Sequence, residues 1–246
     1  MGLIAQIRER IGSAFAAVLA AICFLAFGAV MAFVISPQQA AEWRRIQNLP
    51  ELTASTFAST ATGEEVAVTG TLEGNAPLNA YNHVAYTVDE WRVDPPDEDD
   101  STPVGSWSSI ETVVPELSVA ISGGTISTTG VNSATMGGNL DEIVDEAFSS
   151  QTAKYDGRDL GEGSLRIRGF REGNLITVVG NKASTGDLIP ERLYGGDRVQ
   201  LVDSIRASAR TTFIIGIVMM VISPLVLVGG LIGAAFGKRR RAGINV

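Results

Sequence analysis

An uncharged apolar stretch near the C-terminus, residues 211–236, constrains this chain more than any other feature. It is 26 residues long and is followed closely by the basic run Lys238, Arg239, Arg240 and Arg241. A helix rises about 1.5 Å per residue, so about 20 apolar residues cross the hydrocarbon core of a bilayer. The stretch therefore predicts a transmembrane helix, and the part of the chain before it is tied to a membrane.

A second uncharged apolar stretch, residues 13–35, lies near the N-terminus. Its 23 residues exceed the core of about 7 to 15 residues in a cleaved signal peptide, and no small-residue cleavage site follows before Pro37. We therefore favour a retained first transmembrane helix over a cleaved signal. The expected domains are a cytoplasmic arm at 1–12, membrane helices at 13–35 and 211–236, a connector at 36–63, a β-rich domain at 64–206 and a basic tail at 237–246.

Charge is distributed unevenly along the chain. Residues 36–206 contain 26 acidic and 12 basic residues, a net charge of −14, which argues against a nucleic-acid partner. Both short chain ends are basic, and basic flanks favour the cytoplasmic side of a membrane. We expect a two-pass protein of the cell membrane with both termini cytoplasmic and the middle domain outside, although Arg44 and Arg45 lie on the outer side. For the basic tail, a topology signal with contact to anionic lipid is favoured over a docking segment for a partner.

Short stretches of alternating apolar and polar residues dominate the middle of the chain. Val66, Val68 and Leu72 alternate with polar residues, and so does the segment 83–93, as half-buried strands do. Further short strands are expected at residues 106–114, 117–121, 125–131, 164–168 and 175–179. Strands of this length and spacing favour a small barrel or sandwich. The predicted fold class is α+β, with two transmembrane helices flanking a mainly β extramembrane domain.

One stretch of the domain has helical rather than strand periodicity. Its apolar residues fall on one helical face, and they are Leu140, Ile143, Val144, Ala147 and Phe148. Asn139 is a suitable N-cap, and the two acids that follow Leu140 suit the positive end of a helix dipole. We therefore expect one amphipathic helix at residues 139–148, packed on a side of the β-rich domain.

Both apolar stretches contain small residues four positions apart. Gly28 and Ala32 form such a pair in the first stretch, and Gly229 and Gly233 form one in the second. Small residues at this spacing let helices approach closely in lipid. Pro224, near the middle of the second stretch, predicts a kink there. We interpret the pairs as helix-packing sites, within the chain or between copies. The alternative is that Gly and Ala are simply common in membrane helices.

The chain offers few residues suited to catalysis or metal binding. Weak candidates for Ca²⁺ are the acids of one loop, Asp97, Glu98, Asp99 and Asp100, but their spacing is not that of an EF-hand and a solvated loop is favoured. His83 is the only histidine, Cys23 is the only cysteine, and no Gly-x-Ser-x-Gly motif surrounds a serine. We expect no catalytic residue, no bound metal ion and no cofactor.

Several local motifs follow one another along the middle domain. They are Val68-Thr69-Gly70, Pro77-Leu78, the strand at 83–91, Trp107, Val114-Pro115-Glu116-Leu117 before Gly123-Gly124, the expected helix at 139–148, and Gly173-Asn174-Leu175-Ile176-Thr177-Val178-Val179-Gly180. With the layout of helix, domain and helix, they resemble the GIDE family of two-pass membrane proteins. That family includes a eukaryotic mitochondrial ubiquitin ligase and prokaryotic forms without the ligase part. The resemblance implies that both chain ends lie in the cytosol.

The ligase activity of that family does not carry over to this chain. A RING domain holds its zinc ions through about eight Cys or His ligands. The whole chain has only Cys23 and His83, and the nine residues after Gly237 cannot contain such a domain. The resemblance therefore implies a prokaryotic form that lacks the RING domain.

Three functions remain open from the sequence. The leading hypothesis is a non-enzymatic membrane protein whose outer β-rich domain binds or scaffolds another component, with the lipid bilayer and further copies of itself as partners. The second is an accessory subunit of a membrane enzyme or transporter complex, held to other membrane proteins through its helices. The third is an extracytoplasmic hydrolase, which we rank last because no nucleophile and base are paired in the sequence.

Overall fold

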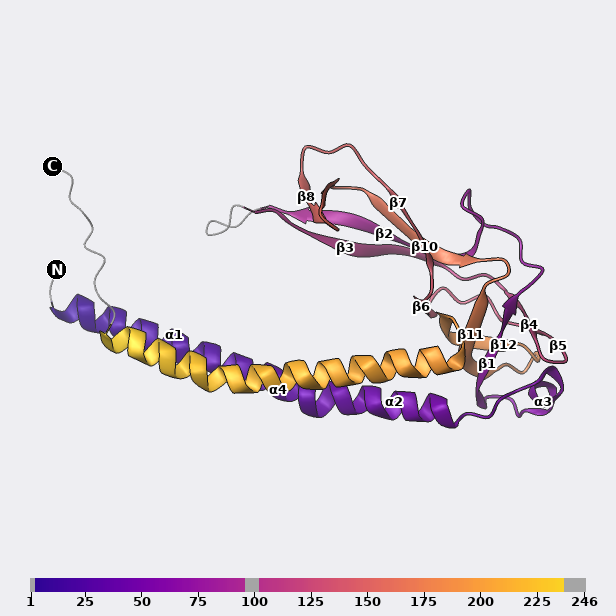
Figure 1. The fold of residues 1–246 in the computed structure, drawn as a ribbon, viewed down its shortest axis with the longest axis horizontal. Coiled ribbons are helices and arrows are strands. Elements are labelled where there is room, and N and C mark those ends of the chain that lie inside the picture. Colours follow the sequence, from indigo (N-terminus) through magenta and orange to yellow (C-terminus); the bar gives the residue numbers. More distant parts are fainter. Residues whose placement is uncertain (1–2, 96–101, 237–246) are drawn as a thin grey trace. The chain divides into compact units, whose positions relative to one another are not determined.

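A computed structural model of the chain describes residues 3–95 and 102–236 (Figure 1). These residues fall into two compact units. One unit contains the chain up to Arg44 and the chain from Asp203 onward, and the other contains Arg45–Val202. The first unit is helical and the second is rich in strands. The expected α+β class, with long apolar helices toward both ends of a β-rich middle, is thus confirmed.

The helices extend beyond the uncharged stretches of the sequence. α1 (Leu3–Val30) continues through a π-helical turn, η1 (Met31–Ile35), into α2 (Ser36–Asn48), and α4 is one helix over Arg198–Phe236. By length and composition, two helices among the described residues are apolar enough to cross a membrane, Ala14–Asn48 and Arg198–Gly233. Much of the expected connector is therefore helical. This follows because no helix breaker separates Pro37 from Pro50.

Strands of the β-rich unit form two larger sheets and one hairpin. The six-stranded sheet has the order β5-β4-β1-β11-β12-β6 and contains β1 (Glu65–Leu72), β4 (Ser118–Ile121), β5 (Gly124–Ser127), β6 (Thr135–Gly138), β11 (Leu175–Lys182) and β12 (Leu188–Gly195). The four-stranded sheet has the order β3-β2-β10-β7 and contains β2 (His83–Asp94), β3 (Val104–Val113), β7 (Asp141–Asp145) and β10 (Leu165–Arg171). β8 (Thr152–Tyr155) and β9 (Arg158–Gly161) form the hairpin. Among the described strands, both larger sheets are open, so they do not close into the barrel that was one of the two expected forms.

The main core joins the two larger sheets. Val66, Val68 and Leu72, the alternating residues of β1, are almost completely buried there. From the four-stranded sheet, Ala85 and Phe170 enter the same core. Burial of alternate residues is what the period-two pattern predicts for a strand with one apolar face. A smaller cluster around Trp91, Ala153 and Leu160 packs the β8–β9 hairpin against β2.

The prediction of an amphipathic helix at residues 139–148 is wrong. β6 ends at Gly138, and Asp141–Asp145 forms β7, which pairs with β10 from Leu165 to Gly169. Ile143 and Val144 are β-branched and suit a strand, where they point to opposite faces. Phe148, which the helical pattern would have buried, is fully exposed. The helical spacing was misleading because the open side of β10 offers this segment backbone partners that an isolated short helix lacks.

A short helix does occur in the β-rich unit, in the segment expected to be a connector. α3 (Ala54–Ser59) begins with a capping box, in which the side chains and backbone N–H groups of Thr53 and Thr56 bond reciprocally. At its other end, Nζ of Lys182 donates to the carbonyl oxygens of Phe57, Ala58 and Thr60 at 2.7, 2.7 and 2.8 Å. A lysine at a helix C-terminus satisfies carbonyl groups that have no partner inside the helix.

Replacing Lys182 by methionine should therefore destabilise the β-rich unit. Methionine keeps most of the apolar stem but removes the donor to the carbonyl groups of Phe57, Ala58 and Thr60, of which Phe57 keeps its bond from the backbone N–H of Thr60. We expect the free energy of unfolding to fall by about 2–3 kcal/mol, the range for a buried charged hydrogen-bond donor. The measurement is denaturant unfolding of the full chain in detergent, followed by circular dichroism.

Lys154→Met is the matched control, because the Lys154 side chain is 64% exposed and its pair with Asp159 lies on the surface. Exposed ion pairs contribute about 0–1 kcal/mol to stability, so the free energy of unfolding of this variant should be close to that of the parent protein. Equal effects of the two substitutions would contradict the role assigned to Lys182.

Candidate functional site

The first site with unusual geometry is the contact between α1 and α4. A Cβ atom added at Gly28 would lie 2.6 Å from the carbonyl oxygen of Gly216. A Cβ atom added at Gly216 would lie 2.7 Å from the backbone nitrogen of Ala32, which is 1% exposed. The two helices therefore touch backbone to backbone, and larger side chains are excluded from these positions.

Two serines add hydrogen bonds to this contact, one between α1 and α4 and one between the start of α2 and α4. Oγ of Ser223 donates to the carbonyl oxygen of Ala21 at 2.7 Å, and Oγ of Ser36 donates to the carbonyl oxygen of Ala209 at 3.0 Å. Both serines are buried. Between helices in lipid, such side-chain hydrogen bonds contribute about 0.6 to 2 kcal/mol each.

Small residues of α4 recur at a spacing that the sequence analysis overlooked. Ala209, Gly216, Ser223 and Gly230 are seven residues apart. Ala209 contacts Ser36 at the start of α2, and the other three face α1 and η1, since a Cβ atom added at Gly230 would lie 2.2 Å from Cβ of Ala17. Seven residues are close to two helical turns, so these positions share one face. A search for small residues at heptad spacing would have found them.

The expected packing residues lie in different environments. Gly28 and Ala32 contact α4, whereas an added Cβ atom at Gly229 or at Gly233 would have no described atom within 4 Å. The four-residue spacing of the second pair turned out to be less informative than the seven-residue spacing of Gly216 and its neighbours.

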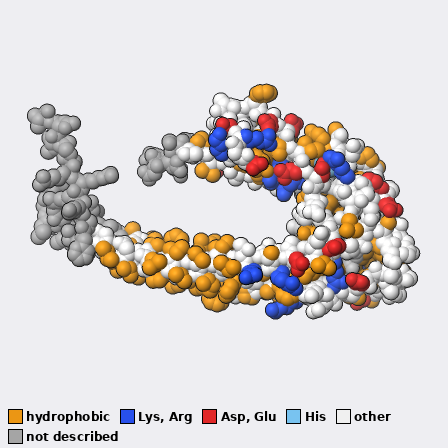
Figure 2. Space-filling model, viewed as in Figure 1, with side chains coloured by type: hydrophobic (Ala, Val, Ile, Leu, Met, Phe, Trp, Pro, Cys, Tyr) orange, Lys and Arg blue, Asp and Glu red, His pale blue; other side chains and the backbone are white. Residues whose placement is uncertain are grey.

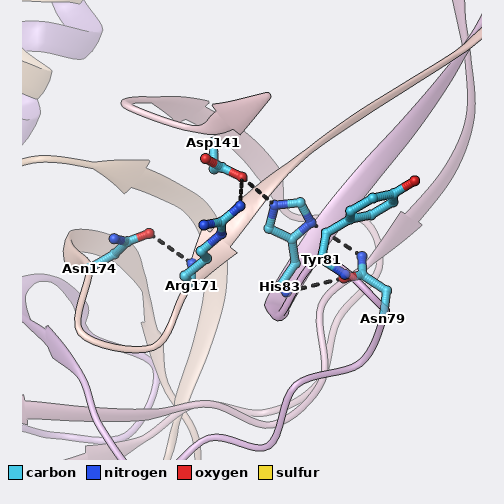
Figure 3. A network of polar contacts seen from close by, with 6 residues as sticks. All are labelled: Asn79, Tyr81, His83, Asp141, Arg171 and Asn174. Carbon is cyan, nitrogen blue, oxygen red and sulfur yellow. Dashed lines mark hydrogen bonds and ion pairs between the residues drawn. The ribbon is translucent and has the colours of Figure 1, made fainter. Parts of the chain in front are cut away.

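The second site is a polar network around His83, at one end of the four-stranded sheet (Figure 3). Oδ1 of Asn79 accepts hydrogen bonds from the backbone N–H groups of Tyr81 and His83, at 3.0 and 3.1 Å. This fixes the orientation of the amide, so Nδ2 of Asn79 must donate to Nδ1 of His83, 3.2 Å away. The ring proton is then on Nε2, which donates to Oδ2 of Asp141 at 3.1 Å.

Both nitrogens of the His83 ring are therefore engaged, and the side chain is completely buried. Asp141 also accepts a hydrogen bond from Arg171, so the network joins β2, β7 and the end of β10. A general base needs a ring nitrogen directed at a substrate, and the described residues leave none. Close packing reinforces this arrangement, because a Cβ atom added at Gly169 would lie 2.8 Å from Cγ of His83. The geometry is that of a structural junction.

Tyr86 lies beside this junction on β2. Burial, and to a smaller extent the carboxylate of Glu111, raises the pKa of Tyr86. The phenol therefore remains protonated and uncharged through neutral pH, and it provides no base for catalysis.

The third site is a cluster of arginine and aromatic side chains on the four-stranded sheet. Oδ2 of Asp89, which is 4% exposed, accepts from Nε and Nη2 of Arg166 at 3.1 and 2.9 Å and from Nη2 of Arg168 at 2.8 Å. The guanidinium carbon of Arg166 lies 4.6 Å from the ring centroid of Trp107. Trp107 in turn packs against Trp91, with ring centroids 5.0 Å apart, and both contact Tyr155 of the β8–β9 hairpin. These side chains bind one another and close the face of the sheet.

The remaining predicted residues fall mostly outside the part of the chain that the structure describes. Asp97, Glu98, Asp99 and Asp100, and the basic run Lys238, Arg239, Arg240 and Arg241, lie outside the described residues. Within the described residues, no group of three or more His, Cys, Asp or Glu side chains is placed to hold a metal ion. Cys23 lies on α1, exposed and unpaired with sulfur.

Comparisons with known proteins leave the family of the chain open. No protein-family model, no curated protein and no solved structure matches this chain. The resemblance to the GIDE family therefore stays a prediction from the motifs of the sequence.

Replacing Gly216 by leucine should disrupt the contact between α1 and α4, because the new side chain would overlap the backbone of α1. Overpacking of this kind costs about 1–3 kcal/mol. We expect a lower midpoint when the protein in mixed micelles is unfolded by increasing SDS. Gly229→Leu is the matched control, since it makes the same change in the same helix at a position with open space. Equal loss of stability in both variants would contradict the packing described here.

Proposed function

We propose that this chain is a non-enzymatic, two-pass protein of the cell membrane whose β-rich domain is a binding, scaffold or oligomerisation module. The observation that supports it best is the pattern of burial in the helical unit. Small residues such as Ala21, Ala32 and Ser223 are buried there, while large apolar residues such as Phe15 and Leu225 are 68% and 67% exposed. A helix of a soluble protein shows the reverse, because water favours burial of its largest apolar side chains.

Lipid accounts for this pattern where water does not. Hydrophobic side chains cover the surface of the helical segments in Figure 2. In a bilayer, apolar side chains gain nothing by leaving the lipid, so helices associate through small residues and interhelical hydrogen bonds. An apolar surface of this extent would lead a soluble protein to aggregate.

Side chains at one end of the apolar stretches suit a membrane interface. The guanidinium carbon of Arg206 lies 4.5 Å from the ring centroid of Trp43, and that of Arg44 lies 5.2 Å from it. Tryptophan and arginine are both favoured at the level of the lipid headgroups. The chain therefore leaves the membrane near Trp43 on α2 and near Arg206 on α4, and the β-rich domain lies on that side.

Charge supports an extracytoplasmic position for the β-rich domain. The opposite flanks of the two helices carry Arg8, Arg10 and the four cations of the tail, while the domain side carries Arg44, Arg45, Arg206 and Arg210. The excess of cations at the chain ends favours the cytoplasm for both termini. On the domain side, Asp203 pairs with Arg206 at 3.2 Å.

The potentially reactive side chains bond to one another, and this supports a non-enzymatic role. His83, Asp141 and Arg171 bond to one another, and Asp89 holds Arg166 and Arg168. An extracytoplasmic hydrolase, the least favoured hypothesis, would need a base or nucleophile left open to a substrate. A distant relationship to prokaryotic GIDE-type proteins without a RING domain is consistent with the proposed role.

The second candidate, an accessory subunit of a membrane complex, is favoured by one specific observation. Gly229 and Gly233 lie on a face of α4 where an added Cβ atom would meet no described atom. Such a face could receive a helix of another membrane protein. The partner would then be held through α4 and not through the β-rich domain.

Purification under mild conditions distinguishes the two candidates. If the β-rich domain is a scaffold or oligomerisation module, the particle should have the mass of several copies of the 25.9-kDa chain. If the chain is an accessory subunit, other proteins should co-purify in fixed stoichiometry. Mass photometry of the protein extracted in nanodiscs gives the mass, and a monomer without partners would contradict both candidates.

The orientation predicts which parts of the chain are accessible from outside the cell. In a Cys23→Ser background, a cysteine at Thr125→Cys in the β-rich domain should react with a membrane-impermeant maleimide in intact cells. A cysteine at Ala242→Cys in the tail should react only after the cells are opened. The reverse pattern would overturn the orientation, and reaction of both positions in intact cells would show that α4 does not place them on opposite sides of the membrane.

A further inference from the structure

β3 is the longest outer strand of the two larger sheets. Their orders place β5 and β6 at the edges of one sheet and β3 and β7 at the edges of the other. β5 and β6 have four residues each and β7 has five, whereas β3 has ten, of which six are exposed. A short edge strand can form only a few hydrogen bonds with an added strand, so β3 is the edge strand best able to pair with another strand.

The backbone of β3 is paired on one side. It pairs with β2 along its whole length, from Val104 opposite Asp94 to Val113 opposite Tyr86. No other backbone hydrogen bond joins Val104–Val113 to the described part of the chain. The N–H and C=O groups along the outer side of β3 are therefore available to another strand.

The side chains of β3 do not protect this edge. Proteins usually block outer strands with charges or proline. β7 is blocked in this way, because three of its five residues are the acids Asp141, Glu142 and Asp145. By contrast, residues 102–110 carry no charge, although the surrounding chain is strongly acidic.

A β-bulge limits the regular part of this edge. Val88 lies opposite Glu111 and Asp89 lies opposite Ser109, so Ile110 has no partner on β2. A bulge bends and twists a strand, which makes the segment after it a poor template. The regular edge is therefore the segment from Val104 to Ser109.

We propose that this segment of β3 pairs with the same segment of a second copy, in antiparallel orientation, and joins two four-stranded sheets. The inference rests on the proposed function, in which the β-rich domain is an oligomerisation module. Identical strands related by a two-fold axis present the same groups to each other, so one exposed edge is sufficient. The exposed residues Ser106, Ser108 and Ser109 are small and create no steric obstacle.

Charge selects the antiparallel orientation. The described residue Asp94 ends β2 opposite Val104, at the start of β3. In a parallel pair, the Asp94 and the Glu111 residues of the two copies would each lie at the same end of the joined sheets and repel each other, whereas in an antiparallel pair they lie at opposite ends. Glu111, the only charge on β3, would lie beyond the paired segment.

Disulfide trapping tests this pairing in the full chain. Single cysteines are introduced at Ser106, Ser108 or Ser109 in a Cys23→Ser background, and the protein is oxidised in nanodiscs. Opposed residues of antiparallel strands have Cα atoms about 4.5–5.5 Å apart, within the range for a disulfide. A residue faces its own copy only at the two-fold axis, so we expect a covalent dimer with a sharp maximum at one serine or, when the axis passes through Trp107, between the Ser106→Cys and Ser108→Cys proteins reconstituted together. Thr125→Cys on the outer strand β5 is the control and should give only background.

A second measurement uses Ser108→Lys, with Thr125→Lys as its control. Two lysines near the axis would repel each other, and we expect self-association measured by mass photometry to weaken about tenfold in the first variant only. Cross-linking at β3 no stronger than at Thr125→Cys would overturn the inference. If the parent is nevertheless an oligomer, the scaffold role stands and its interface lies elsewhere. If the parent is a monomer, the inference and the oligomeric form of the proposed function both fail.

Discussion

Close backbone contact between α1 and α4 is the constraint on which the helical unit depends. Gly28, Ala32 and Gly216 leave no room for larger side chains, the hydrogen bond of Ser223 spans the same contact, and that of Ser36 extends it to the start of α2. In lipid, the hydrophobic effect does not press helices together, so dispersion contacts and polar pairs must stabilise the association. Small side chains maximise both, because they bring the two backbones within hydrogen-bond reach.

The first and last segments of the β-rich unit are also joined to each other. α2 leads into that unit, and α4 begins where its last strand ends. Nη2 of Arg198, at the start of α4, donates to the carbonyl groups of Ile46 and Gln47 at 2.6 and 2.7 Å. The first and last segments of the unit are thus tied together by a cation at a helix end, which is the arrangement that Lys182 repeats at α3.

Polar groups within the β-rich unit have a different role from those of an active site. His83 uses both ring nitrogens, and Asp89 binds two guanidinium groups while it is almost completely buried. Buried charges and polar groups are costly unless they have partners, so networks of this kind favour one packing of the strands, although Nε of Arg168 is buried without a hydrogen-bond partner among the described residues. The surface left for recognition is therefore backbone and small side chains, as along β3, more than reactive groups.

Sequence patterns by themselves determined the coarse architecture. Two uncharged stretches specify long apolar helices because hydrocarbon length sets helix length, and the alternation in Val66, Val68 and Leu72 specifies a strand because one face must be buried. The helical periodicity of residues 139–148 led to a wrong prediction, because this segment is too short to form a stable helix alone and its residues Asp141–Asp145 pair with β10 instead. Only the tertiary structure decided which small residues of α4 meet α1, since Gly216 and Gly229 are chemically identical. Their difference arises from the side of the helix on which the second backbone lies.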